Sequence, residues 1–259
     1  MGEATASLRR ADRAPVTGPS YRGRGACPAY CVGAIVAAMT STAPHDGIVD
    51  LLGVVAYLEL MAFSQLAADA GMAPTQPERA AVAKLAVAQF GHYETIVGRL
   101  ESLGADPEGA MAPFVAAIDE FHRRTRPRDW FEGLVKAYVG DGVAQDFYTE
   151  VARFVDPQTR DVVVEVMSNT VHAEVVIPTV REAISADPAL GGRLALWGRR
   201  LVGEMLTEAQ RIGVEREGLT SLLVGGVDGV GADLAEFGRM LARITDEHTR
   251  RMERLGLSA

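Results

Sequence analysis

Cysteine, lysine and long apolar runs are scarce in this chain of 259 residues. The only cysteines are Cys27 and Cys31, which excludes a disulfide framework and a four-cysteine zinc site. Lysine occurs only as Lys84 and Lys136. Beyond residue 39, no stretch reaches the roughly eighteen uninterrupted apolar residues of a transmembrane helix. We therefore expect a cytoplasmic protein without a membrane partner.

Positive charge is also in deficit, since the formal net charge is −8 at pH 7. A protein that binds nucleic acid through its general electrostatics needs clustered cations, so this composition argues against that class. Hydrophobic residues make up 48% of the chain, enough for one sizeable core. One helical domain is the simplest interpretation.

The first 44 residues differ from the rest of the chain. Several arginines and glycines precede an apolar stretch from Ala26 to Met39. The pattern loosely matches a signal peptide, but the charged part is long and the apolar part is too short to span a bilayer. We assign residues 1–44 to an N-terminal extension, which is either disordered or the result of a mis-assigned translation start. Residues 45–256 are assigned to the helical domain.

Helical periodicity dominates from residue 46 onward and predicts an all-α fold. Four long helices are expected, with a shorter helix and a crossing connection in residues 108–128. The start signals of the long helices are Pro44-His45-Asp46, Pro77-Glu78, Asp129 and Asp156-Pro157. Two more helices are expected at about 189–212 and 219–254. The pattern therefore predicts a four-helix bundle with additional C-terminal helices.

Each of the four long helices carries polar residues within its apolar stripe. The carboxylates are Glu59 and Asp141, and the motifs that follow them are Gln89-Phe-Gly-His92 and Asn169-Thr-Val-His172. The carboxylate precedes its motif by 30 residues in the first half and by 28 in the second. Isolated polar groups in a core are costly unless they are paired or coordinated, so their recurrence at one level indicates a shared partner.

Helix geometry suggests what that partner is. Residues three apart project from one helix face, and ferritin-like di-iron proteins place two Glu and two Glu-x-x-His motifs in the bundle core. The spacing therefore predicts a metal site made by Glu59, the two histidine motifs and Asp141. The chain departs from the pattern because both motif carboxylates are amides, Gln89 and Asn169.

Four segments of the chain resemble a known family: Tyr57–Phe63, Gln89–Glu94, Asp129–Gly142 and Glu165–Glu174. They are similar to bacterial, mostly actinobacterial, ferritin-like proteins of the type of the tRNA-methylthio-isopentenyl-adenosine hydroxylase, MiaE. The resemblance implies a non-haem di-iron centre that activates dioxygen and hydroxylates an unactivated carbon–hydrogen bond. The substrate would be a small molecule or a modified nucleoside, with tRNA as the weaker alternative.

The resemblance also implies roles for the site residues. Glu59 and Asp141 would be terminal carboxylates and His92 and His172 nitrogen ligands, while the two amides would occupy the places of bridging carboxylates. A neutral amide cannot offset the repulsion between two dications about 4 Å apart. Three outcomes stay open: another glutamate compensates, only one metal binds, or hydrogen bonds hold a metal-free site. The candidate substitutes are Glu165, Glu94 and Glu174.

Several other polar residues have two interpretations. Tyr138 either donates its hydroxyl to a ligand or packs in the core. Glu204 and Glu208 either orient a ligand histidine or, as we favour, pair with nearby arginines. The arginine cluster either meets a tRNA backbone or, as we favour, forms a solvated connection; its members are Arg123, Arg124, Arg126 and Arg128. We expect His248 to be structural.

Two functional classes remain open. The first is an oxygen-activating hydroxylase with two iron ions, or with one. The second is a metal-poor ferritin-like module for binding or assembly, in which the amide and histidine side chains fix the register of the core. A homodimer is compatible with either class.

Overall fold

The computed structural model describes residues 29–168, 171–216, 218–219, 222 and 234–259. Every regular element in these residues is helical, so the all-α prediction is confirmed for the described chain. Two compact units are distinguished, Met1–Ala38 and Met39–Ala259. All that follows concerns the second unit.

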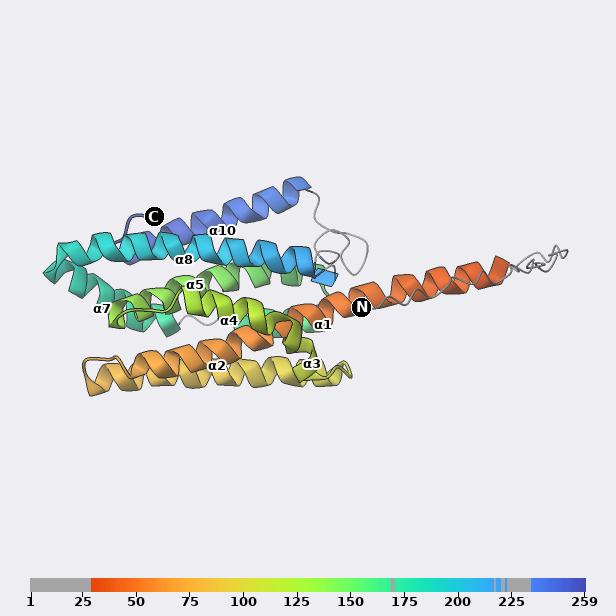
Figure 1. The fold of residues 1–259 in the computed structure, drawn as a ribbon, viewed down its shortest axis with the longest axis horizontal. Helices are drawn as coiled ribbons and strands as arrows, with labels where there is room; N and C mark the ends of the chain where they lie inside the picture. Colours follow the sequence, from red (N-terminus) through yellow and green to blue (C-terminus); the bar gives the residue numbers. More distant parts are fainter. Residues whose placement is uncertain (1–28, 169–170, 217, 220–221, 223–233) are drawn as a thin grey trace, which may run out of the picture. The chain divides into compact units, whose positions relative to one another are not determined.

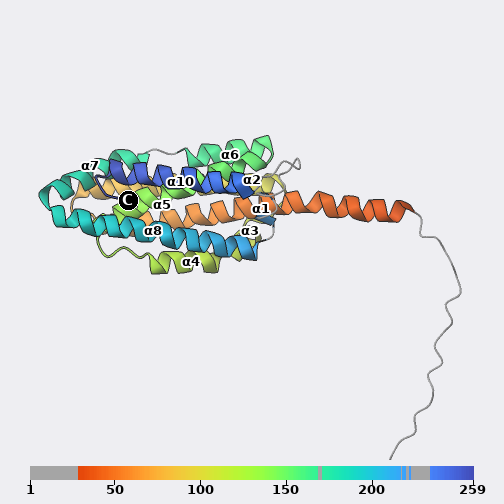
Figure 2. The same cartoon turned by 90° about the horizontal axis from the view of Figure 1, so that it is seen from above.

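Figures 1 and 2 show the helices. The α-helices are α1 (Ala29–Ala70), α2 (Gln76–Ser102), α3 (Pro107–Met111), α4 (Val115–Arg124), α5 (Trp130–Val151), α6 (Pro157–Met167), α7 (Val171–Ala186), α8 (Pro188–Glu215) and α10 (Leu234–Arg254). Two short 3₁₀ turns, η1 (Ala112–Phe114) and η2 (Ala152–Phe154), continue α3 and α5. The C-terminal helices α8 and α10 add to the bundle, as predicted.

Aspartate followed by proline starts three of these helices. Asp106, Asp156 and Asp187 each accept a hydrogen bond from a backbone N–H of the first turn, which satisfies one of the donors left free at a helix start. The proline that follows each aspartate already has a helical φ and lacks an N–H that would need a partner. Asp129 caps α5 in the same way, through the backbone N–H of Glu132.

Helix α5 runs through the middle of the bundle in both views (Figures 1 and 2) and packs against α6, α7, α8 and α10. Two large apolar clusters form the core. One includes Leu85, Val135 and Leu201, and the other includes Leu52, Ile96 and Val163. The core therefore encloses α5 and the buried sides of α1 and α2, which are the helices that carry the predicted site.

Two predicted helix boundaries are wrong. Helix α1 begins at Ala29, not near Asp46, because the alanine-rich segment before Pro44 favours a helix strongly enough to continue through the proline. The fourth long helix is divided into α6, which ends at Met167, and α7, which begins at Val171. Asn169, one of the predicted ligands, lies outside the described residues.

One helix of the described residues, His45–Ala70, is long and apolar enough to cross a membrane by length and composition. In its most apolar window, 56% of the residues are buried inside the structure. Glu59, which faces the core, is also part of this helix. These features are typical of the core helix of a bundle.

Candidate functional site

Five of the six predicted ligand residues line one cavity. Helix α1 contributes Glu59, α2 contributes Gln89 and His92, α5 contributes Asp141 and α7 contributes His172. Glu59, Gln89 and His172 are buried. The side chains of His92 and Asp141 are each 22% exposed, so the cavity reaches the surface.

The cavity has a volume of about 100 Å³ and a mainly apolar wall. Small residues provide the space, since Ala137, Gly140 and Ala144 lie along the side of α5 that faces it. The larger apolar residues of the wall are Leu58, Leu66, Val166, Met167 and Met205. A polar group in this wall is removed from bulk water, which strengthens its electrostatic interactions.

The polar side chains are connected through Gln89. Its Nε2 donates to both oxygens of Asp141, at 3.1 and 3.3 Å, and its Oε1 lies 2.9 Å from Nδ1 of His92. The same Nδ1 lies 3.3 Å from Oε2 of Glu59. Because both neighbours are acceptors, Nδ1 of His92 carries the proton and donates to them. Gln89 thus connects the two predicted carboxylate–histidine pairs.

His172 belongs to the second pair. Its Nδ1 lies 2.6 Å from Oδ2 of Asp141, an ion-pair distance. Neither ring nitrogen has a well-aligned hydrogen bond in the described part of the chain, so the contact is mainly electrostatic. Burial, the largest single effect, opposes protonation of this imidazole, but the charge and hydrogen-bonding contact of Asp141 together with the charge of Glu59 raise the pKa of His172.

Glu59 is the most strongly perturbed carboxyl group of these pairs. Burial raises its pKa to about 7, although the contact with His92 acts in the opposite direction. A carboxyl group whose pKa is higher in the folded protein stabilises the fold through its protonated form. That stabilisation is complete below the unfolded value, 4.5, and is lost as the pH rises through 7.

We expect Glu59→Gln to flatten the pH dependence of stability in metal-free protein. Between about pH 5 and pH 8, the free energy of unfolding of the wild type should decline by roughly 1–3 kcal/mol more than that of the variant. Urea denaturation at each pH measures this difference. Glu94→Gln, an exposed glutamate on α2, is the matched control and should follow the wild type. Parallel wild-type and Glu59→Gln profiles would contradict the burial argument.

Four predicted auxiliary residues do not reach the cavity. Glu94, Glu165 and Glu174 are exposed, and none of these candidate substitutes lines the cavity in this conformation. The break after Met167 removes the continuous helix on which the choice of Glu165 depended. Tyr138 is buried in the apolar core, does not line the cavity, and its hydroxyl has no hydrogen-bond partner among the described residues.

A second polar cluster lines the same cavity and was missed by the sequence reasoning. Asp69 on α1, His122 on α4 and Lys136 on α5 all face this space. Nζ of Lys136 lies 3.1 Å from Nδ1 of His122. Two features of the sequence could have indicated this cluster. Asp69 lies ten residues after Glu59 on the same stripe of the helix, and lysine is rare in the chain.

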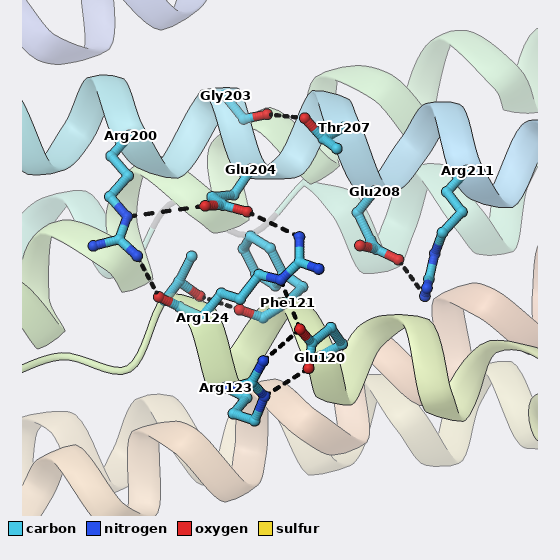
Figure 3. Close-up of polar contacts among 11 residues, drawn as sticks. Glu120, Phe121, Arg123, Arg124, Arg200, Gly203, Glu204, Thr207, Glu208 and Arg211 are labelled. Atoms are coloured by element: carbon cyan, nitrogen blue, oxygen red, sulfur yellow. Dashed lines mark hydrogen bonds and ion pairs between the residues drawn. The ribbon is translucent and has the colours of Figure 1, made fainter.

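Three of the four arginines in the cluster before α5 form ion pairs, and Figure 3 shows those of Arg123 and Arg124. Arg123 and Arg124 bind Glu120, and Arg124 also reaches Glu204 on α8 at 3.6 Å. Arg128 pairs with the buried Glu132. These contacts hold the connection against the bundle.

The two glutamates on α8 have arginine partners, which is the interpretation we favoured. Glu208 binds Arg211 at 2.6 Å, and Glu204 is within 4.0 Å of Arg200 (Figure 3). Among the described residues, neither glutamate forms an ion pair or a hydrogen bond with a predicted ligand histidine. The contact of Glu204 with Arg124 also joins α8 to α4.

The carboxylate and imidazole groups at the cavity are suitable ligands for a divalent cation. In this structure, however, each histidine is paired with one carboxylate. In the described part of the chain, no group of three or more His, Cys, Asp or Glu side chains is arranged to hold a metal ion. Histidines that contact carboxylates through one ring nitrogen are nevertheless typical of metal centres. The buried ring nitrogens of His172, which lack aligned hydrogen bonds, fit such a role.

Comparison with known proteins gives one result. Residues 43–226 match the model of a protein family described as "Ferritin-like domain, actinomycetes". No curated protein matches the chain. The matched region includes α2 to α8 and most of α1, and therefore every residue of the cavity described above. This chain belongs to the ferritin-like domain family of actinomycetes.

Proposed function

We propose that this ferritin-like protein is an iron-dependent hydroxylase of the MiaE type, in which one ferrous ion is bound by Glu59, His92, Asp141 and His172. The observation that carries the proposal is the convergence of two carboxylate–histidine pairs, from four different helices, on one mainly apolar cavity. Such ligands are typical of non-haem iron.

Charge favours one ion over two. The carboxylates of Glu59 and Asp141 offset the charge of a single dication, whereas two dications would leave two positive charges uncompensated in a buried site. Gln89 is neutral, and Glu94 and Glu165 are exposed and do not line the cavity. Of the three outcomes, we therefore favour the one in which the described residues bind a single metal ion.

The pair distances are compatible with a shared ion. Two ligand atoms that each lie about 2.1 Å from a metal, at roughly a right angle, are separated by about 3 Å. Nδ1 of His92, which would have to lose its proton to bind the ion, is 3.3 Å from Glu59, and Nδ1 of His172 is 2.6 Å from Asp141. Gln89 now lies between the pairs, so its hydrogen bonds must open when a cation enters.

The protein's own contribution to the reaction is positioning and exclusion of water. A bound ferrous ion would supply the activation of dioxygen. The apolar wall around Leu58, Leu66 and Val166 accommodates a carbon–hydrogen bond and keeps bulk water away.

The size of the cavity restricts the substrate. A volume of about 100 Å³ accepts only a short apolar group, since one water molecule takes about 30 Å³ in the liquid. Two of the arginines that might meet tRNA phosphates, Arg123 and Arg124, are bound to Glu120. We therefore favour a small molecule or a free modified nucleoside as the substrate.

Iron content tests the proposal. Protein purified from iron-supplemented cells should hold about one iron per chain, and His92→Ala and Glu59→Ala should each lose most of it, because removing one of four ligands typically weakens metal affinity severely. Metal analysis by mass spectrometry gives the ratio. His45→Ala, an exposed histidine, is the matched control and should retain iron. Equal trace iron in all four proteins would overturn the enzyme proposal.

The same measurement decides the second candidate, a metal-poor binding or assembly module. The observation that favours it is the hydrogen-bond network from Glu59 through His92 and Gln89 to Asp141, which is closed without an ion. Such a network can fix the register of a core. A module of this kind should contain no iron and should have the same melting temperature with and without added ferrous ion.

A further inference from the structure

The cavity contains a buried lysine that the proposed hydroxylase chemistry does not use. Lys136 is 7% exposed, and so is Asp69 on the opposite helix α1. The only other lysine, Lys84, is exposed on α2. A lysine buried at a cavity in a chain that otherwise uses arginine is unusual, because arginine is the more common choice for a buried ion pair.

Burial makes the neutral amine of Lys136 more populated than in an exposed lysine. Its Nζ lies 3.1 Å from Nδ1 of His122 and 5.5 Å from the ring centre of Phe121. In the described part of the chain, Lys136 forms no direct ion pair with Asp69, although both line the cavity. Burial lowers the pKa of Lys136 to about 8, while the charge of Asp69 acts in the opposite direction.

The neighbouring groups provide a proton donor and a neutral acceptor. Burial raises the pKa of Asp69 to about 6, so part of this carboxyl group is protonated near neutral pH. Burial and the charge of Lys136 lower the pKa of His122 to about 3, so its ring is neutral and its Nδ1 can accept a hydrogen bond. Gly133 leaves room for the carboxyl group, since a Cβ there would lie 3.0 Å from Oδ2 of Asp69.

We propose that Lys136 is a reactive amine that binds a small, uncharged aldehyde or ketone in the cavity as an imine. The geometry that carries this inference is a lysine in an apolar cavity with an acid across the space and a neutral imidazole at hydrogen-bond distance. A desolvated lysine in such surroundings is a nucleophile of the kind that forms Schiff bases. The inference does not depend on iron.

The reaction balances with the groups present. The lone pair of Nζ attacks the carbonyl carbon, a carbon–nitrogen bond forms, and the carbonyl π electrons move to oxygen. The oxygen then takes up one of the two protons of the positively charged nitrogen, which gives the neutral carbinolamine. Asp69 then donates a proton to the hydroxyl of the carbinolamine, which leaves as water while the nitrogen lone pair forms the second carbon–nitrogen bond. The proton remaining on nitrogen returns to Asp69, so the net products are the imine and water.

Cavity size and charge define the class of ligand. An anionic ligand would meet the nearby carboxyl group of Asp69 as well as the ammonium of Lys136, so the pair does not select for an anion. The apolar wall, with Leu66 and Met205, favours an uncharged aliphatic chain of a few carbons. A short aldehyde or a methyl ketone satisfies both conditions.

Reductive trapping in metal-free full-length protein tests the inference. The protein, dialysed against a chelator, is incubated near pH 7 with propanal and cyanoborohydride, and the two lysine-containing peptides are followed by mass spectrometry. At this pH about one Lys136 amine in ten is neutral, against fewer than one in a thousand for an ordinary lysine. Lys136 should therefore be propylated at least about tenfold faster than Lys84, after allowance for its lower access.

Variants then separate local reactivity from general labelling. Lys84→Met should leave modification of Lys136 unchanged. Asp69→Asn should slow it severalfold, although loss of the charge increases the neutral fraction of the amine, because the carbinolamine then lacks its proton donor; Lys84 should keep its rate. Circular dichroism verifies that each variant is folded. The comparison of two lysines within the wild type needs no variant, so a folding defect cannot obscure it. Equal or faster labelling of Lys84, or labelling of Lys136 only in urea, would overturn the inference whether or not iron binds.

Discussion

Gln89→Glu is expected to destabilise the metal-free protein by about 2–4 kcal/mol near pH 8. Gln89 is 2% exposed, and its amide donates to both oxygens of Asp141. A carboxylate at this position cannot donate those two hydrogen bonds and instead repels the carboxylate of Asp141. Glu59, which lines the same cavity, adds to the repulsion. Urea denaturation measures the loss, which should diminish toward pH 5 as the new carboxyl group becomes protonated.

Ferrous ion should reverse this destabilisation. With a third carboxylate between the two histidine pairs, the charge that is needed to hold two dications becomes available, so iron content should rise from about one toward two per chain. Gln65→Glu adds the same charge to the cavity wall away from His92 and is the matched control. An equal loss of stability with and without iron would argue against any metal at this position.

Gly53→Ala is expected to cause the largest loss of stability that does not involve the site, about 2–4 kcal/mol. A Cβ at Gly53 would lie 2.2 Å from the backbone oxygen of Ala110 and 2.7 Å from its carbonyl carbon. Because these are backbone atoms, no side-chain rotation relieves the overlap, and α1 and α3 must separate. Chemical denaturation measures the effect.

Gly98 provides the matched control for Gly53. It is an exposed glycine within α2, and a Cβ at this position meets no atom within 4 Å. Gly98→Ala should therefore stabilise the protein by about 0.5–1 kcal/mol, through the higher helix propensity of alanine. If both variants shift the unfolding midpoint in the same direction, the close approach of α1 and α3 does not limit stability.

Much of the fold was predictable because its signals are local. Asp129, Asp156 and Asp187 cap their helices through bonds to backbone groups two or three residues away. The helical period also placed Glu59 and His92 on inward faces, and their separation along the chain, 33 residues, is close to the 31 residues between Asp141 and His172. The convergence of these four side chains could therefore be inferred from spacing alone.

The orientation of α5 was predicted only in part. The stripe assumed from the sequence ran through Tyr138 and Asp141, whereas the cavity is lined by Asp141 together with Lys136, Ala137 and Ala144. A helix with apolar residues on most of its circumference does not reveal which side faces which neighbour. In α5, that choice depends on contacts with α6, α7, α8 and α10.

What the sequence determined by itself was the helical class, most helix starts and the set of residues for a central polar site, since each follows from a repeat or a contact within one helical turn. Only the tertiary structure decided that Glu165 is exposed, that α6 and α7 are separate, and that Asp69, His122 and Lys136 meet across one cavity. These facts depend on how helices distant in sequence pack together. Packing is set by the sum of many weak side-chain contacts, which no local pattern encodes.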